Sequence, residues 1–176
     1  MRKPIIAGNW KMHKTPREAR TWMETFARQL GEVPHDRVEI LLGVPATHLA
    51  AMRDAAGAAG VALAGQDLSR HDEGAYTGEI SGAMLSDAGA TFVIVGHSER
   101  RAYHGEDDAE VAAKLSAAAK SGLTPILCIG EVEEERDAGR AEEVVLDQLR
   151  AAIGDLDLTS PEALVIAYEP VWAIGT

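Results

Sequence analysis

The fold is decided by the stretch FVIVGHSERRAYHGEDDAEVAAKLSAAAKSGLTPILCI, residues 92–129 of the chain. Two short runs of mostly branched apolar residues, 92–95 and 125–129, flank a segment with helical signals from about 107 to 121. Short apolar runs are typical of buried strands, and Gly122 is the kind of residue that commonly ends a helix. The stretch therefore predicts a strand, a crossover helix and a second strand.

The same unit repeats on both sides of this stretch. Further apolar runs occupy residues 4–8, 38–43, 61–65 and 164–167. Helical signals fill the gaps: a capping box with a proline at 15–18, a segment at 45–56, a shorter one starting near 81, and one at 140–153. Six strands and five helices in strict alternation favour a parallel sheet covered by helices, either doubly wound or closed as a barrel. No linker divides residues 1–176, so we expect a single domain.

Composition and charge exclude several classes of protein. The chain is 46% hydrophobic and 26% charged, the balance of a globular domain rather than of a disordered or fibrous protein. Its net charge of -11 repels nucleic acids and anionic membranes. The single Cys128 cannot form an internal disulfide, which favours a reducing compartment. The apolar stretch near the N-terminus is too short for a signal peptide or a membrane span, so we expect a cytoplasmic protein.

Unusual polar residues follow the predicted strands. They are Asn9 and Lys11 after the first strand, Gln66 and Asp67 after the third, His97 to Arg101 after the fourth, Glu131 after the fifth and Glu169 after the sixth. Parallel strands bring their carboxyl ends to one rim, where folds of this class carry their chemistry. A rim with lysine, histidine and glutamate is suited to binding a small anion and moving protons.

Three of these residues have environments that suggest a role. Glu169 precedes a mostly apolar tail at 170–176 that has the composition of a lid. Closure of such a lid would desolvate the carboxylate and make it a base for a carbon-bound proton. His97 lies at a possible helix start, which disfavours the imidazolium and favours a neutral hydrogen-bond donor to an oxyanion. Lys11 would supply a local positive charge.

Four stretches together resemble one known family. They are GNWKM at 8–12, GAYTGE at 74–79, VGHSERR at 95–101 and AYEPVWAIGT at 167–176. In order and spacing they are similar to the triosephosphate isomerases. The resemblance implies a (β/α)8 TIM barrel and the interconversion of dihydroxyacetone phosphate and D-glyceraldehyde 3-phosphate through an enediolate, a step of glycolysis and gluconeogenesis. It implies no cofactor and no metal.

The resemblance also implies roles for individual residues. Glu169 would abstract the proton, neutral His97 would polarise the carbonyl, and Lys11 would supply positive charge near the phosphate and the enediolate. The other positions that it implies are Asn9 and Gly175 as substrate-binding groups, Ser98 and Glu99 as supporting groups, and Thr77 in a loop that inserts into a neighbouring subunit. A homodimer is therefore implied.

The chain departs from the family in length. A TIM barrel has eight strand and helix units in ~250 residues, whereas residues 1–176 resemble the first six and end inside the lid. Six strands would leave the first and the last as unpaired edges, which proteins normally cover. We therefore expect a truncated barrel, impaired turnover if the last quarter is truly absent, and either a separate C-terminal fragment or an altered assembly that pairs the edges.

Two other hypotheses remain open. The first is an inactive barrel fragment that self-associates through its open edges. The second is another sugar-phosphate barrel enzyme that uses a metal, which is disfavoured because the strand ends carry no cluster of metal ligands. We expect the acidic run at 131–136 to be a solvated face rather than a metal site, and Cys128 to be a packed thiol rather than a nucleophile.

Overall fold

The computed structural model describes residues 3–31, 36–154, 156 and 163–174. Within these ranges one parallel sheet contains β1 (Ile5–Asn9), β2 (Glu39–Gly43), β3 (Val61–Gly65), β4 (Phe92–Val95), β5 (Thr124–Ile129) and β6 (Val165–Tyr168). The helices are α1 (Pro16–Leu30), α2 (Ala46–Ala58), α3 (Gly82–Asp87), α4 (Ser98–His104), α5 (Asp108–Lys120), α6 (Glu133–Asp137), α7 (Ala141–Ile153) and the 3-10 helix η1 (Val171–Ala173). Every predicted strand is confirmed to within a residue or so at its ends.

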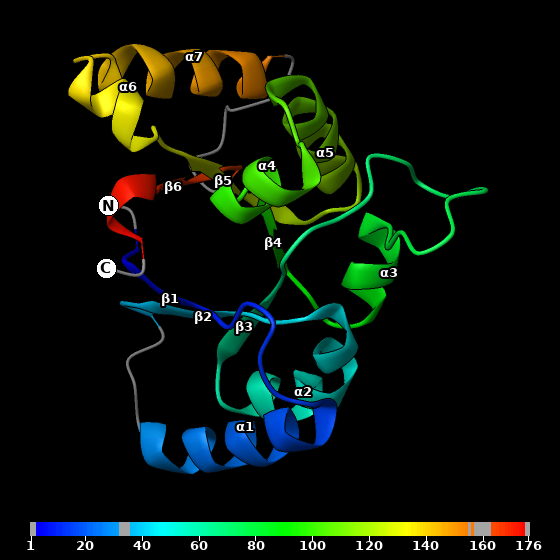
Figure 1. Ribbon diagram of the computed structural model, residues 1–176. Coiled ribbons are helices and arrows are strands. Elements are labelled where there is room, and N and C mark those ends of the chain that lie inside the picture. Colours follow the sequence, from blue (N-terminus) through cyan, green and yellow to red (C-terminus); the bar gives the residue numbers. More distant parts are fainter. Residues whose placement is uncertain (1–2, 32–35, 155, 157–162, 175–176) are drawn as a thin grey trace.

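The strand order decides between the two architectures that the sequence left open. The strands lie in sequence order from β1 to β6, and each pairs in parallel with the next. A doubly wound sheet reverses its strand order at a switch point, whereas a barrel wall does not. The sheet curls so that β1 and β6 lie on either side of its open edge (Figure 1). The fold is therefore a truncated TIM barrel.

The longer helices α1, α2, α5 and α7 lie outside the curled sheet, and each buries apolar residues. In α1 the predicted capping box forms, with the Glu18 main-chain N–H donating to the Thr15 hydroxyl at 3.4 Å and the Thr15 main-chain N–H donating to the Glu18 carboxylate at 2.8 Å. The helix then buries Ala19 and Met23. No helix among the described residues has the length and apolar character needed to cross a bilayer.

Two hydrophobic clusters lie on the two faces of the sheet. The larger cluster fills the space between sheet and helices and includes Leu49, Val93 and Leu115, each fully buried. The smaller cluster lines the concave face and consists of Leu41, Ala64, Ile94, Ile126 and Cys128. Cys128 is 3% exposed, so the prediction of a packed thiol is confirmed.

The helix count corrects one prediction. The described residues contain two short helices, α4 and α6, that strict alternation did not include. Helix α4 begins because the His97 side chain accepts the main-chain N–H of Glu99, and it ends at Gly105, whose left-handed φ of 69° favours glycine. The helix start that the sequence suggested at His97 is confirmed, although a helix of seven residues carries too little hydrophobic periodicity for its length to be predicted.

Burial of the outer strands corrects a second prediction. All six apolar runs were expected to be buried, yet Ile6 on β1 is 63% exposed, and Ile166 and Tyr168 on β6 are 49% and 55% exposed. The cause is position in the sheet, because β1 pairs with β2 alone and β6 with β5 alone among the described strands. The predicted open edges are therefore present.

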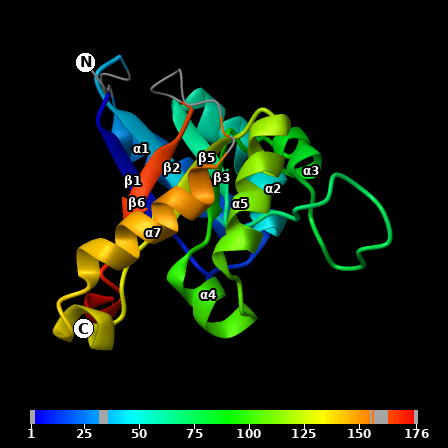
Figure 2. The same ribbon diagram turned by 90° about the horizontal axis from the view of Figure 1, so that it is seen from above.

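One loop leaves the body of the molecule. The segment between β3 and α3 projects outward past α3, and both views show it clear of the helices (Figures 1 and 2). It contains Thr77, which the sequence assigned to an intersubunit contact. Within the loop the rings of His71 and Tyr76 stack at 3.8 Å and 3° between their planes.

Candidate active site

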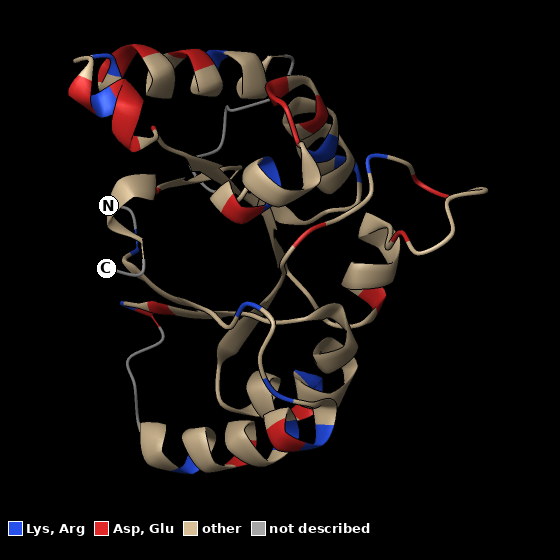
Figure 3. Ribbon diagram, in the orientation of Figure 1, with Lys and Arg blue, Asp and Glu red and all other residues tan. Residues whose placement is uncertain are grey.

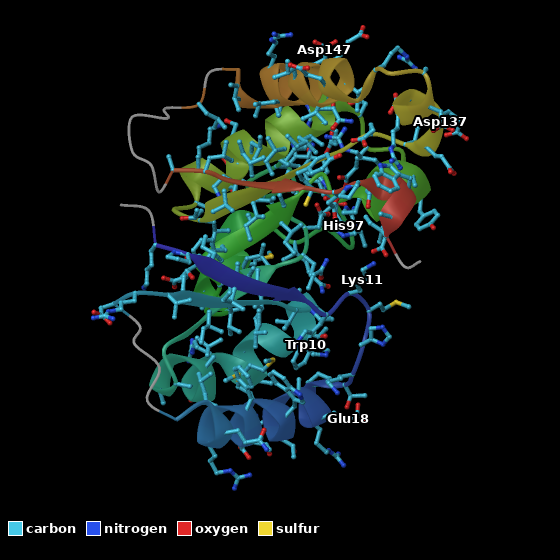
Figure 4. The ribbon with its side chains drawn as sticks, turned by 90° about the vertical axis from the view of Figure 1, so that its left-hand side faces the viewer. Trp10, Lys11, Glu18, His97, Asp137 and Asp147 are labelled. Carbon is cyan, nitrogen blue, oxygen red and sulfur yellow. The ribbon has the colours of Figure 1, made fainter. Side chains whose placement is uncertain are left out.

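A pocket of about 830 Å³ opens at the carboxyl ends of the strands. Its lining includes Asn9 and Lys11 after β1, Gln66 after β3, and His97 and Glu99 after β4. Lys11 and His97 lie on the same side of the sheet in Figure 4. The pocket thus brings together the predicted rim residues that follow β1, β3 and β4, whereas Glu131 and Glu169 are not part of its lining.

Glu169 reaches this pocket through His97. Its Oε1 lies 2.9 Å from His97 Nε2, and its Oε2 accepts the main-chain N–H of Ser98 at 3.0 Å. The Glu169 and His97 side chains are 15% and 10% exposed. The candidate base and the candidate electrophile are therefore in direct contact and largely screened from solvent.

The hydrogen bonds of His97 define its tautomer. The main-chain N–H of Glu99 donates to His97 Nδ1 at 3.2 Å, and a peptide N–H is always a donor, so Nδ1 carries no proton. The Glu99 carboxylate lies farther away, 3.6 Å from the same nitrogen. The proton of a neutral ring is then on Nε2, which faces the Glu169 carboxylate. The geometry is compatible with the predicted donor role of His97, which stays a prediction.

The carboxyl group of Glu169 is held in its ionised form. Burial alone would raise its pKa, but hydrogen bonds from His97 and from the Ser98 main chain outweigh burial and lower the pKa below its usual value. The nearby thiol of Cys128 lowers the pKa of Glu169 further. Burial and the Glu169 charge raise the pKa of Cys128, so this thiol stays protonated.

Lys11 and Glu99 complete the connected set of side chains. Lys11 Nζ donates to Glu99 Oε1 at 2.7 Å, and the two side chains are 38% and 43% exposed. A partly exposed pair of this kind leaves the ammonium able to exchange its partner for an incoming anion. Contacts therefore run without interruption from Glu169 through His97 and Glu99 to Lys11.

A cluster of four charges, two of them buried and two half-buried, adjoins the pocket. Lys114 Nζ donates to Glu106 Oε1 at 2.5 Å and to Asp67 Oδ1 at 2.7 Å. Arg100 donates to the same two carboxylates, at 2.5 and 2.9 Å. The Lys114 and Glu106 side chains are each 5% exposed. The cluster joins the end of β3 to α4 and α5, and its members Asp67 and Arg100 line the pocket.

The acidic run at 131–136 corrects a third prediction. Acidic residues do gather on α6 and α7 (Figure 3), but Glu131 is only 1% exposed. It accepts the indole N–H of Trp172 at 2.9 Å and the hydroxyl of Tyr168 at 3.0 Å, while Arg136 stacks on the Trp172 ring at 3.5 Å. Glu131 therefore holds the start of the tail instead of facing solvent.

Some site residues were missed or lie outside the described ranges. Gln148 on α7 binds both the N–H and the carbonyl of Gly130, at 2.9 and 3.1 Å, and no pattern in the sequence pointed to it. Gln66 was noted only as a rim residue, although it contacts both Asn9 and Lys11. The prediction for Gly175 lies outside the described residues.

Within the described ranges, no group of three or more His, Cys, Asp or Glu side chains has the arrangement of a metal site.

Comparisons with known proteins give a consistent result. A family model described as triosephosphate isomerase matches residues 4–176. The triosephosphate isomerase of Trichodesmium erythraeum is 52% identical over 176 residues, which are 100% of this chain and 71% of that protein. That of Thermus thermophilus is 50% identical over 176 residues, 100% of this chain and 69% of that protein. The crystal structure of triosephosphate isomerase from Bartonella henselae superposes with a TM-score of 0.88 at 42% identity, covering 97% of this chain and 69% of that one.

Proposed function

Because the chain belongs to the triosephosphate isomerase family, we propose that it interconverts dihydroxyacetone phosphate and D-glyceraldehyde 3-phosphate in glycolysis and gluconeogenesis. Its relatives bear the name of an isomerase enzyme. One observation carries the proposal: the unbroken line of contacts from Glu169 through His97 and Glu99 to Lys11. A carboxylate base, a donating imidazole and an ammonium are the groups that stabilise an enediolate beside a phosphate.

The reaction begins at Glu169. Its carboxylate takes the proton from the carbon next to the carbonyl, and the electron pair of that C–H bond forms the C–C double bond of an enediolate. The carbonyl electrons pass to oxygen, where His97 Nε2–H and the Asn9 amide donate to the developing charge. Lys11 stabilises the enediolate and the phosphate. His97 passes the proton of the hydroxyl oxygen to the former carbonyl oxygen, and the electrons of that O–H bond form the new carbonyl. Protonated Glu169 returns its proton to the neighbouring carbon, so no cofactor or metal takes part.

The contact between Glu169 and His97 fits this sequence of steps. In the structure Glu169 Oε1 lies 2.9 Å from His97 Nε2 and accepts its N–H. A bound carbonyl oxygen would take the place of Oε1, and the carboxylate would turn toward the substrate carbon. Ser98, which now donates to Oε2, holds the resting carboxylate. Glu99 supports Lys11 and His97, and Gly175 supplies a main-chain donor to the phosphate.

We also propose a homodimer. The support for this proposal is the projecting loop that contains Thr77 (Figure 1). The His71 and Tyr76 rings stack within this loop, and a projecting loop with such internal contacts is suited to insertion into a second copy of the chain. Thr77 would reach the partner's pocket and complete it. The pocket extends beyond the catalytic groups to the exposed Met12 and Tyr103, which leaves space for a loop tip.

Residues 1–176 are proposed to form one domain, because a single sheet runs through their described part.

The exposed apolar residues of β1 and β6 support a further proposal: a separate C-terminal fragment of the barrel pairs with both edges. Without this fragment, the chain would isomerise its substrate slowly.

We propose a cytoplasmic location, with no nucleic acid or membrane as a partner, on the basis of the charge of -11 and the single cysteine.

The function is tested by proton exchange and turnover together. In D2O the chain is expected to introduce deuterium at the carbon next to the carbonyl of glyceraldehyde 3-phosphate, as observed by NMR, and a coupled assay should detect dihydroxyacetone phosphate. Glu169→Gln should lower the rate by roughly 10²–10⁴-fold, the usual contribution of a general base. Activity that disappears with a chelator would instead indicate the metal-dependent alternative.

Sedimentation distinguishes the proposed enzyme from the remaining hypothesis, an inactive fragment that self-associates. An inactive fragment that associates through β1 and β6 would sediment as an assembly of irregular size and show neither exchange nor turnover. The proposed enzyme would show exchange together with a defined dimer. Exchange without a dimer would leave the chemistry standing and overturn only the homodimer.

A further inference from the structure

The main chain of Lys11 has an unusual conformation. Its φ is 52°, in the left-handed region that a side chain bearing a Cβ disfavours. Such a conformation persists only where neighbouring groups hold it, and it is frequent at sites where a group must be aimed. The neighbours that hold Lys11 therefore determine where its ammonium points.

Gln66 is one of the neighbours that hold the main chain of Lys11. Its Nε2 donates to the Lys11 carbonyl at 2.9 Å, to Asn9 Oδ1 at 3.0 Å and to the Gly43 carbonyl at 3.2 Å. All three neighbours are acceptors, so only the NH2 end of the amide fits there. Gln66 lies 55 residues from Lys11 in the sequence and reaches it from β3 across β2.

The orientation of Asn9 is fixed by the same arrangement. The main-chain N–H of Lys11 donates to Asn9 Oδ1 at 3.0 Å, so this atom must be the amide oxygen. With its oxygen between the N–H of Lys11 and the NH2 of Gln66, Asn9 turns its own NH2 group away from both. Replacing the Gln66 donor would release the Asn9 oxygen and the Lys11 carbonyl together.

We propose that Gln66 is a positioning residue of the isomerase: its amide holds the Lys11 main chain and the Asn9 side chain in the orientation that binds the substrate anion. The inference rests on the proposed function. Gln66 acts through the two groups that it holds, and neither its amide nor its carbon chain needs to touch the reacting atoms. A simple tie between strands, through the Gly43 carbonyl, would stabilise the fold but would leave catalysis unchanged.

The first test removes the donor while keeping the size of the side chain. Gln66→Met is expected to lower kcat/KM about 10- to 100-fold, with KM raised and kcat lowered, because misplacement of a binding group by about 1 Å has effects of this order. Gln66→Glu, which keeps length and polarity but presents oxygens to three acceptors, is expected to do the same. The matched control is Gln29→Met on the exposed surface of α1, which should stay within about twofold of the wild type.

The second test asks whether Gln66 acts through Lys11. In a Lys11→Ala background, Gln66→Met should lose most of its effect, because the ammonium that it positions is gone. Binding of inorganic phosphate, followed by NMR titration, gives a readout independent of turnover and should show the same loss of coupling. Circular dichroism confirms that each variant is folded, and either substitution at position 66 is sufficient for the test.

Two results would overturn the inference and leave the isomerase standing. One is a folded Gln66 variant whose kcat/KM lies within about twofold of the wild type. The other is an equal loss in the wild-type and Lys11→Ala backgrounds, which would mean that Gln66 does not act through the Lys11 ammonium. A wild-type chain that neither exchanges protons nor binds phosphate would overturn the proposed function, and this inference with it.

Discussion

Gly130 packs against the main chain of Glu169 so closely that a Cβ at position 130 would overlap the Glu169 carbonyl group. The end of β5 thus serves as the surface on which the candidate base rests. Glu169 N–H also donates to the Ile129 carbonyl at 2.8 Å, and Gln148 holds Gly130 at both its N–H and its carbonyl. The position of the candidate base therefore depends on Ile129, Gly130 and Gln148, none of which takes part in the proposed reaction.

Gly130→Ala is expected to displace Glu169 and lower kcat about 10- to 100-fold, since small displacements of a catalytic group have effects of that size. Steady-state kinetics on the folded variant measures it. Gly57→Ala in α2 is the control, because a Cβ there meets no atom within 4 Å. That substitution should leave the rate unchanged and stabilise the protein by about 0.4–1 kcal/mol. An unchanged kcat for Gly130→Ala would mean that the main chain of Glu169 can move without cost.

The ionisation of Glu169 makes stability depend on pH. Burial raises its pKa, but the bonds from His97 and Ser98 dominate, so the pKa of the folded state lies below the usual 4.5. A carboxyl group with a lowered pKa stabilises the folded state fully above its unfolded pKa, and this contribution is lost as the pH falls through the folded value. The difference in unfolding free energy between the wild type and Glu169→Gln should therefore shrink as the pH falls from neutral through the lowered pKa of the folded state.

Urea unfolding at several pH values measures this difference. The exposed Glu24 on α1 offers a control, because Glu24→Gln makes the same change at an exposed position. Its effect on stability should be small. A Glu169→Gln difference that stays constant with pH would contradict the proposed hold of His97 and Ser98 on the ionised carboxylate.

The four-charge cluster predicts that a substitution of Lys114 lowers the stability of the fold substantially. Lys114→Met leaves the carboxylates of Asp67 and Glu106 buried with Arg100 as their remaining cation. Removing one partner of a buried ionic group costs about 3–5 kcal/mol. Lys120→Met, at the exposed end of the same helix, should change stability by less than about 0.5 kcal/mol. A loss below about 1 kcal/mol for Lys114→Met, measured by urea unfolding, would mean that water already compensates the cluster.

The alternation of apolar runs predicted the sheet well because each strand is a local feature. The runs at 61–65 and 92–95 match β3 and β4 residue for residue. Strand order could not be read from periodicity, since a doubly wound sheet and a barrel bury the same kind of strand. The apolar runs alone did not predict the exposure of Ile6 and Ile166, because burial depends on which strands lie beside them; the expected lack of two barrel strands did predict the open edges.

The candidate site was predictable where its residues follow a strand and not where they reach it from elsewhere. Lys11, His97 and Glu169 come directly after β1, β4 and β6, so a rule about strand ends finds them. Gln148 approaches from the middle of a helix, and its amide could contact any of several main-chain groups. Glu131 looked like part of a solvated acidic run because its burial depends on Trp172, 41 residues away.

The contact between Trp172 and Glu131 predicts how the tail is held. Burial raises the pKa of Glu131, but the donors Trp172 and Tyr168 lower it overall, so their bonds to the ionised carboxylate stabilise the fold. Trp172→Phe keeps a ring for Arg136 to stack on but removes the indole N–H. Loss of a hydrogen bond to a buried charged group costs about 1–3 kcal/mol.

The dependence of this cost on pH identifies its source. Because the pKa of Glu131 is lowered in the folded state, the cost of Trp172→Phe should be complete at neutral pH and shrink as the pH falls through that pKa. Trp22→Phe on α1 is the matched substitution, since Trp22 packs on Phe26 and Trp10 through its ring. Its cost should not change with pH. If the two variants respond alike, the tail is held by the Arg136 stack, and the carboxylate of Glu131 contributes nothing to holding it.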